Sequence, residues 1–548
     1  MSSAPAQDSS RPRSWKAAGV WLVLILIFSS PWHYRNDIHP ANEAARVYAA
    51  QAIAQYGTLN LEVVFDLYSP DWRKSGTPPI LDVAKTEKAY VLDKAPGATI
   101  LAVPFVWLSH NLGLNPGFAE LTWFLAFLLC GIPTVLLLRQ LEKNLGATQS
   151  GILIARATVL ASPLLAYAGM LFGHALATAC IGLGSLFALG SPRNERIPRR
   201  GIQFFGGFLI GLAVLSEYTC ALIAIFALIS LLTQKDRGLR LLAVIAGGTL
   251  PLAALLTWNA LNFGDPFALS YGFKADASHA AIHSQGIYGI SWPSPDRAWG
   301  TLFGAQRGLF FLSPWLILGF VGAIVCLRTK EIRGPWRTML PLTVFGFPIF
   351  VSGFVDWTAG LSMGPRHLMP MLPFMALAIH ILVESKEAER QKSIWQPLLT
   401  GLILSSALIA IIGSYVFPYF DTRTANPFFE VILPVFLEAG SGPTLWNRFL
   451  SPNLVLALAL MGAAALLIRP KSAKLSFEKG RLFAGILVVA AMLTHLLGAM
   501  QIESQPQTSK ASVLKARAFA HEMLGQEAFA KQIRDALAPH PANDRLRE

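Results

Sequence analysis

The chain has 548 residues, of which 53% are hydrophobic and only 14% are charged. A water-soluble protein of this length needs many more charged side chains to cover its surface, so the composition excludes that class and predicts a polytopic membrane protein. The net charge of +13 does not indicate a nucleic-acid-binding protein, because most of the Lys and Arg residues lie in short clusters between apolar runs.

The N-terminus carries three basic residues, Arg11, Arg13 and Lys16, directly before the first apolar run at 17–32. No clear signal-peptidase site follows this run. The pattern therefore predicts a signal anchor, with residues 1–16 in the cytoplasm.

Apolar runs recur along the rest of the chain and are separated by short basic connectors. The runs lie at 97–113, 117–138, 150–169, 172–190, 202–216, 218–233, 239–261, 305–327, 337–355, 367–383, 397–418, 452–468 and 481–499. The connectors lie at 139–146, 191–200, 234–240, 328–337, 384–393 and 469–481. The positive-inside rule assigns all of these connectors to the cytoplasm.

The run at 97–113 does not fit a simple series of spans that cross the membrane alternately outward and inward. Residues 33–96 are expected outside and the connector at 139–146 inside, so an odd number of crossings must separate them. The run is short for a span and contains Pro104 and His110, which favours a helix or re-entrant segment at the outer interface. The predicted fold class is therefore all-α and polytopic, with about 13 transmembrane helices, a cytoplasmic N-terminus and an extracytoplasmic C-terminus.

The apolar stretch from 202 to 233 has basic connectors at both ends, so it is expected to turn back near Glu217. Each limb is then about 22 Å of helix, shorter than the ~30 Å hydrocarbon core. An acid at this depth indicates a cavity that reaches down from the outer face, or a packing partner for the carboxylate. A single long helix is the alternative to the turn.

Most of the informative ionisable residues lie in segments expected on the extracytoplasmic face, so function is expected there. These segments are 33–116, 262–304, 356–366, 419–450 and 500–548. We expect a catalytic transmembrane module at 17–385, followed by C-terminal transmembrane helices at 386–499. The tail at 500–548 has helical periodicity and mixed charge, which predicts a solvated or surface-lying helix.

Four stretches occur in an informative order and spacing. They read "NEAARVYAAQAIAQYG" from residue 42, "DKAPGATILAVPF" from residue 93, "GAQRGLFFLSP" from residue 304 and "GPRHLMPMLPF" from residue 364. With this order, residues 15–385 resemble the C-type (GT-C) membrane glycosyltransferases that use polyprenyl-phosphate sugars, most of all the group of aminoarabinose transferases and protein mannosyltransferases. The resemblance implies a GT-C-like fold with interfacial helices in the first extracytoplasmic loop.

The first outside helix of that family carries an acid, often Asp-Glu followed by Arg. The matching positions here are Asn42 and Glu43, with Arg46 following, so the resemblance assigns the role of the acid to Glu43 or to the nearby Asp37. The position of Glu43 also suits a general base, because partial desolvation near a membrane raises the pKa of a carboxyl toward the working pH. The alternative is a structural acid that meets the helix dipole and pairs with Arg46.

Two further positions follow from the resemblance. The family often has a second Asp between the third and fourth spans, and His174 is the only ionisable residue in the matching stretch. The Lys-Pro-Pro stretch of the family, thought to meet the lipid phosphate, is matched by Lys94 and the three residues after it. The alternative for Lys94 is a lysine that extends to lipid headgroups.

Arg307 and Arg366 lie at the outer ends of predicted spans, against the positive-inside rule. Each is therefore expected to have an anionic partner, either a phosphate or a carboxylate. Asp356 is a candidate structural partner for Arg366, and His367 is placed to assist.

Together these residues predict a glycosyltransferase that moves a sugar from a polyprenyl-phosphate donor to an extracytoplasmic lipid, glycan or protein, in the inner membrane of a bacterium. The assigned roles are a catalytic base for Glu43, donor phosphate binding for Lys94, Arg307 and Arg366, and support for Asp37, Arg46, His174, Glu217 and His367. If a metal binds, Mg²⁺ or Mn²⁺ is expected between the phosphate and Glu43, with His174 as another candidate ligand.

Two alternatives stay open. A transporter or flippase for a lipid-linked or small anionic substrate would show internal symmetry and ionisable residues along a route through the membrane. The clustering of the ionisable residues on one face disfavours it. A non-catalytic member of the fold is the other alternative, and Asn42 and His174 are the residues that keep it open.

Overall fold

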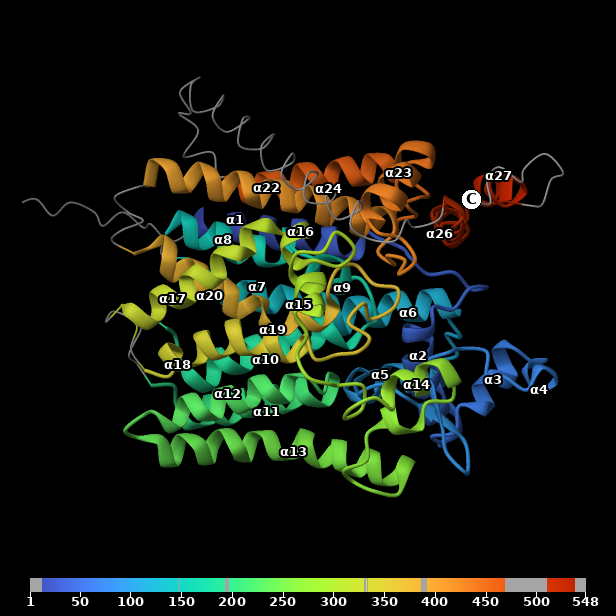
Figure 1. Cartoon of the computed structure of the whole chain (residues 1–548), viewed down its shortest axis with the longest axis horizontal. Helices are drawn as coiled ribbons and strands as arrows, with labels where there is room; N and C mark the ends of the chain where they lie inside the picture. Colours follow the sequence, from blue (N-terminus) through green and yellow to red (C-terminus); the bar gives the residue numbers. More distant parts are fainter. Residues whose placement is uncertain are drawn as a thin grey trace, which may run out of the picture.

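The computed structural model describes residues 12–146, 148–192, 197–329, 332, 334–385, 392–468 and 510–537. In Figure 1 the long helices lie side by side along the long axis of the molecule, and short elements such as α2, α3, α14, α26 and α27 gather at one end. The predicted last span at 481–499 and the connector at 469–481 lie outside the described residues.

Helices make up most of the described chain. The elements of the first part are α1 (Pro12–Ser29), α2 (Ala41–Tyr56), α3 (Glu62–Tyr68), α4 (Trp72–Ser75), β1 (Val83–Lys85), β2 (Tyr90–Leu92), α5 (Gly97–Asn111), α6 (Phe118–Ala126), η1 (Phe127–Gly131), α7 (Ile132–Leu145), α8 (Gln149–Leu160), α9 (Leu164–Ala168) and α10 (Gly173–Leu189). Those of the middle part are α11 (Arg200–Ser216), α12 (Cys220–Leu232), α13 (Arg237–Phe263), η2 (Ser270–Phe273), α14 (Ala277–His283), α15 (Pro295–Leu302), α16 (Leu309–Leu312), η3 (Pro314–Ile317) and α17 (Leu318–Arg328). The last part contains α18 (Trp336–Pro341), η4 (Leu342–Gly346), α19 (Phe347–Val351), η5 (Arg366–Met371), α20 (Leu372–Val383), α22 (Lys392–Val416), η6 (Phe428–Ile432), α23 (Leu433–Ala439), α24 (Pro452–Leu467), α26 (Lys510–Met523) and α27 (Glu527–Leu537).

Within the described residues, four helices are long and apolar enough to cross a membrane by length and composition. They are Phe118–Leu145, Arg237–Phe263, Arg366–Val383 and Trp395–Val416. Shorter apolar helices cover the other predicted spans up to residue 468, at Gly19–Ser29, Gln149–Leu160, Gly173–Leu189, Arg200–Ser216, Cys220–Leu232, Pro314–Arg328, Trp336–Val351 and Pro452–Leu467. The all-α polytopic prediction is thereby confirmed, while the number of crossings stays a prediction.

The predicted span at 305–327 differs from the observed helix. Its first part forms the short helix α16, which ends at Leu312, and a continuous helical stretch begins only at Pro314. Proline has no backbone N–H to donate and disfavours helical geometry in the residue before it. The hydrophobic run therefore contains a break that hydropathy alone does not reveal.

The predicted turn at Glu217 is present. Helix α11 ends at Ser216 and α12 begins at Cys220, with Glu217 in an extended conformation between them. Helices α11 and α13 run parallel, since Gly207 lies against Val244 and Gly211 against Gly248. The intervening α12 must therefore run in the opposite direction. Glycines allow the backbones of α11 and α13 to approach closely, which is typical of helix packing in membranes.

Helix α5 corresponds to the run expected at the outer interface. It packs against α2 within a hydrophobic cluster separate from that of the helical body, and this cluster also contains Phe65, Trp72 and Phe118. Figure 1 shows α5 beside α2, at the end of the molecule where the short elements gather.

The described part of the C-terminal tail forms two helices, and the first of them packs on the protein body. Helix α26 packs against η6 and α23, and it buries Ala516, Ala520, His521 and Met523. Its small and apolar residues form one face, so the helix covers part of the protein body.

Candidate active site

A cavity with a volume of about 520 Å³ lies among the short elements at this end of the molecule. Most of the candidates predicted from the sequence line it together, namely Glu43, Arg46, Lys94, His174, Glu217, Arg366 and His367. The charged lining consists of four acidic and four basic side chains: Glu43, Asp82, Glu217 and Asp356, and Arg46, Lys94, Lys274 and Arg366.

Glu43 lies in the first turn of α2 and is completely buried, with 0% of its surface exposed. The hydroxyl of Tyr419 donates a 2.7 Å hydrogen bond to its Oε1, while Oε2 has no hydrogen-bond partner. Helix α2 is not one of the spanning helices. Burial raises the pKa of the Glu43 carboxyl to about 8, although the hydrogen bond from Tyr419 acts to lower it. The group therefore titrates close to physiological pH.

Arg46 makes no ion pair with Glu43 among the described residues, so of the structural alternative only the position of Glu43 in the first turn of α2 is observed. The Nη1 of Arg46 donates to the backbone carbonyl of Asn42 at 2.9 Å and also to the Asn42 side-chain oxygen. Asn42 therefore orients Arg46, which leaves the Glu43 carboxylate to Tyr419. The Nε of Arg46 is buried without a hydrogen-bond partner.

A small β-hairpin places Lys94 in a network of charges. Strands β1 and β2 pair antiparallel with Val83 opposite Leu92, so Asp82 before β1 lies next to Asp93 and Lys94 after β2. The Nζ of Lys94 is 2.8 Å from Asp82 Oδ1 and 3.3 Å from Asp93 Oδ1.

Lys274 completes this network. A bridge between Ala84 and Lys274 brings it to the hairpin, where its Nζ binds Asp93 Oδ2. Burial lowers the pKa of Lys94, while Asp82 and Asp93 act to raise it. Although burial acts to raise the pKa of Asp82, its lysine neighbours hold that pKa well below the usual value.

Two glycines bring the hairpin and α10 against the turn at Glu217. A Cβ atom on Gly97, the first residue of α5, would lie 2.8 Å from both Cα and N of Ser216. A Cβ on Gly173, the first residue of α10, would overlap the Ser216 carbonyl oxygen. Only residues without a side chain allow this approach, which places Lys94, His174 and Glu217 around one cavity.

Arg366 and His367 enter the cavity from the start of η5. The guanidinium carbon of Arg366 lies 5.6 Å from the centroid of the Phe172 ring, and the ring of His367 stacks on Phe354 at 4.9 Å. The expected pairing of Arg366 with Asp356 is not observed among the described residues. Asp356 instead accepts hydrogen bonds from its own loop, from Thr358 Oγ1 at 2.8 Å and from the backbone N–H of Ala359 at 3.1 Å.

Arg307 does not line the cavity that contains the other predicted phosphate-binding residues, Lys94 and Arg366. It is fully buried, and its guanidinium donates to the backbone carbonyls of Thr358, Gly360 and Phe420 at 2.8–3.0 Å. The backbone carbonyls of two loops take the place of the anionic partner that was expected for Arg307. Arg307 therefore links the loop that contains Gly360 to the loop that contains Tyr419 and Phe420.

Asp37 also lies away from the cavity. It pairs with Arg35 at 2.6 Å, and its side chain is 63% exposed. Of the two acids predicted for the first outside helix, Glu43 lines the cavity and Asp37 does not.

Several cavity residues were not identified from the sequence. They are Asp82, Lys274, Tyr419, and Phe519 and Met523 of α26. The acid next to Lys94 in "DKAPG" was a local signal that this lysine has a carboxylate partner. Nothing local indicates Tyr419 or the residues of α26, since they reach the cavity from distant parts of the chain.

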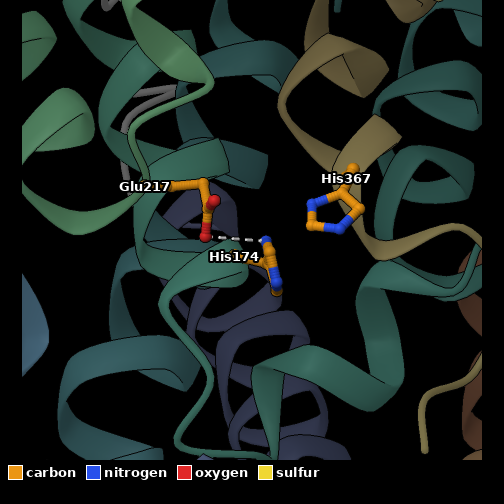
Figure 2. Close-up of side chains that lie close together, drawn as sticks. All are labelled: His174, Glu217 and His367. Carbon is orange, nitrogen blue, oxygen red and sulfur yellow. Dashed lines mark ion pairs between the residues drawn. The ribbon is translucent and has the colours of Figure 1, made fainter. Parts of the chain in front are cut away.

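The cavity contains several side chains of the types that bind metal ions. Glu43 does not belong to a group of three ligand-type side chains among the described residues. His174, Glu217 and His367 do form such a group, and Figure 2 shows the three side chains reaching toward one another from three elements. The expectation of a metal held by Glu43 thus lacks supporting ligands, whereas His174 has them.

No protein-family model matches this chain, and no curated protein matches it. Two solved structures are similar to it, both of ArnT from Cupriavidus metallidurans. The structure bound to undecaprenyl phosphate is 12% identical, with a TM-score of 0.41, over 92% of this chain and 80% of that chain. The apo structure is 13% identical, with a TM-score of 0.40, over 96% of this chain and 81% of that chain. At this level of superposition and identity, the likeness carries no conclusion about what this chain does.

Proposed function

We propose that the chain is a glycosyltransferase that moves a sugar from a polyprenyl-phosphate donor to an acceptor on the extracytoplasmic side of a bacterial inner membrane. The observation that carries the proposal is the cavity itself. It combines a buried carboxylate of raised pKa, Glu43, with the cations Lys94, Arg46 and Arg366, at the end of a bundle of apolar helices.

The acid and the cations suit the two halves of a displacement reaction. Glu43, with a pKa of about 8, is a stronger base than an ordinary carboxylate and accepts the proton of the acceptor hydroxyl. The acceptor oxygen then forms a bond to the anomeric carbon of the sugar. The bond from that carbon to the phosphate oxygen breaks, and its electron pair remains on the polyprenyl phosphate.

The departing phosphate needs neutralisation rather than a proton. Arg366 is the best placed cation, because its guanidinium stacks on Phe172 and makes no ion pair with another described residue. Lys94 already has two carboxylate neighbours, so its contribution depends on exchanging one of them for the phosphate. Preorganised cations around a leaving phosphate stabilise the transition state without reorganising at the moment of reaction. A direct displacement of this kind inverts the anomeric centre.

The test uses the purified full-length chain in detergent or liposomes. It is incubated with a panel of undecaprenyl-phosphate sugars that carry hexoses, pentoses and amino sugars, with cell-envelope extract as the acceptor source. Release of undecaprenyl phosphate and appearance of the sugar in a new product support the proposal. If every lipid of the panel binds but none releases undecaprenyl phosphate, the result points instead to a transporter or a non-catalytic member of the fold.

A further inference from the structure

His174, Glu217 and His367 come from three separate elements and meet in the cavity. His174 is the second residue of α10, Glu217 lies in the turn between α11 and α12, and His367 is the second residue of η5. One ligand atom from each side chain lies within 4.8 Å of the other two. In Figure 2 the carboxylate and the ring of His174 face each other, and the ring of His367 stands across the same space.

The polar atoms of this group are poorly satisfied by the protein. The Nδ1 of His174 lies 3.2 Å from Glu217 Oε2 but makes no hydrogen bond, and the Nδ1 of His367 is also buried without a partner. The two imidazole rings lie 5.6 Å apart at 85°. Buried polar groups are nearly always hydrogen-bonded, and a bound ion is one explanation for an exception.

The three side chains are supported by rigid neighbours. The ring of His367 stacks on Phe354, with the planes only 8° apart. The close contact of Gly173 with Ser216 fixes the start of α10 against the turn that carries Glu217. Ligands on such elements need only rotamer adjustments to close around an ion.

We propose that His174, Glu217 and His367 bind a divalent transition metal of the Zn²⁺ type, with its fourth position open to the cavity. Two imidazoles and one carboxylate form a donor set that suits zinc, whereas Mg²⁺ and Ca²⁺ prefer oxygen ligands throughout. Ligands at about 2.0–2.1 Å from tetrahedral zinc lie roughly 3.3 Å from one another, so no two ligand atoms of the group need to approach by more than about 1.5 Å when the ion binds.

The charge of the cavity bears on what the open position would take. The four acidic and four basic side chains of the lining balance formally, so a bound divalent ion gives the cavity an excess of positive charge. An oxygen anion is the complementary ligand, in the form of a phosphate oxygen or a deprotonated hydroxyl. The nearby cations of Arg46 and Arg366 weaken the binding of any metal, while the carboxylate of Glu217 offsets them.

Metal binding is measured without donor or acceptor, so it succeeds or fails independently of the proposed transfer. The full-length chain is purified in detergent, incubated with Zn²⁺, desalted and analysed for bound metal by mass spectrometry. The wild type is expected to retain about one zinc ion per chain, and the double variant His174→Ala/His367→Ala to retain nearly none. Equal retention by the two proteins, or no retention by the wild type, overturns the proposal.

Two further variants make the measurement specific. His283→Ala removes another cavity imidazole, one that stacks on Tyr271 and does not belong to the group, and is expected to retain zinc as the wild type does. Glu217→Gln keeps the size of the side chain and is expected to weaken zinc binding at least about tenfold, since an amide is a poor zinc ligand. Loss of zinc from His283→Ala to the same extent as from the double variant contradicts the assignment.

A spectroscopic readout covers the case in which the double variant does not fold. Co²⁺ replaces Zn²⁺ in such sites, and its visible absorption reports the coordination geometry. Wild-type protein is expected to show the intense bands of four-coordinate Co²⁺, resistant to an excess of Mg²⁺ and absent in Glu217→Gln. Displacement of Co²⁺ by Mg²⁺, or the same spectrum in Glu217→Gln, overturns the proposal.

Discussion

The hydroxyl of Tyr419 donates a 2.7 Å hydrogen bond to the carboxylate of Glu43, across 376 positions of the chain. Glu43 belongs to the first outside helix and Tyr419 to the loop after α22. The same loop contributes the carbonyl of Phe420 to the guanidinium of Arg307. The buried acid is thus positioned by a loop that Arg307 fixes in place.

The first prediction concerns the pH dependence of Tyr419→Phe. A hydrogen bond donated to a carboxylate favours its charged form, so its loss raises the pKa of Glu43 above about 8. A base acts only when deprotonated, so the rate of transfer should rise with pH up to the pKa and level off above it. The midpoint of the rate profile should lie at higher pH in Tyr419→Phe than in the wild type. A midpoint that stays in place, or moves to lower pH, contradicts this role for Tyr419.

The second prediction separates binding from folding at Lys94. Lys94→Met leaves Asp82, whose side chain is 17% exposed, without its 2.8 Å partner, which should lower stability by about 1–3 kcal/mol. The double variant Asp82→Asn/Lys94→Met removes both charges and should recover most of the melting temperature. If Lys94 binds the donor, the double variant should still bind undecaprenyl phosphate at least about tenfold more weakly, because charge-assisted hydrogen bonds contribute ~1.5–3 kcal/mol. Wild-type affinity in the double variant excludes Lys94 from the phosphate site.

The third prediction contrasts two arginines. Arg307→Met removes the guanidinium donor from the carbonyls of Thr358 and Gly360 and one of two donors from the carbonyl of Phe420, so it should lower stability by about 1–3 kcal/mol. Arg366→Met loses only its stacking on Phe172, about 0.5–1 kcal/mol, but should weaken donor binding roughly tenfold. Melting curves and lipid titrations of the two variants check this. The reverse pattern would show that Arg307 meets the phosphate.

The fourth prediction concerns the packing that assembles the cavity. Gly97→Ala places a methyl group against the backbone of Ser216 and should cost about 1–3 kcal/mol, with loss of donor binding as Lys94 moves away from Glu217. Gly238→Ala is the matched control, because a Cβ on this glycine of α13 meets no atom within 4 Å. It should be neutral or slightly stabilising, since alanine favours helix more than glycine does. Equal melting temperatures and equal lipid binding in the two variants contradict the packing role of Gly97.

Hydropathy and charge asymmetry were sufficient to predict the helical body. They predicted the turn at Glu217, and they set the run that forms α5 apart from the spanning helices. These features are local, since each depends on the apolar length of a stretch and on the basic residues at its ends. The break before Pro314 was missed because hydropathy does not respond to a missing backbone donor.

The cavity was predictable only in part. Glu43 and Lys94 were identified from the family resemblance, and Arg366 was identified because an arginine at the outer end of a span runs against the positive-inside rule. The same criterion selected Arg307, since an arginine that binds carbonyls cannot be distinguished by sequence from one that faces an anion. Lys274 and Tyr419 reach the cavity through a strand bridge and a loop, and no pattern along the chain encodes such pairings.

The most direct measurement is the release of undecaprenyl phosphate from the best donor of the panel by wild type, Glu43→Gln and Asp37→Asn. Glu43→Gln keeps the shape of the buried side chain but cannot accept a proton, so its rate should fall by about 10²–10⁴-fold while donor binding is retained. Asp37→Asn changes an exposed acid outside the cavity and should leave the rate unchanged. Wild-type turnover by Glu43→Gln, or an equal loss in both variants, would contradict the assignment of Glu43 as the base.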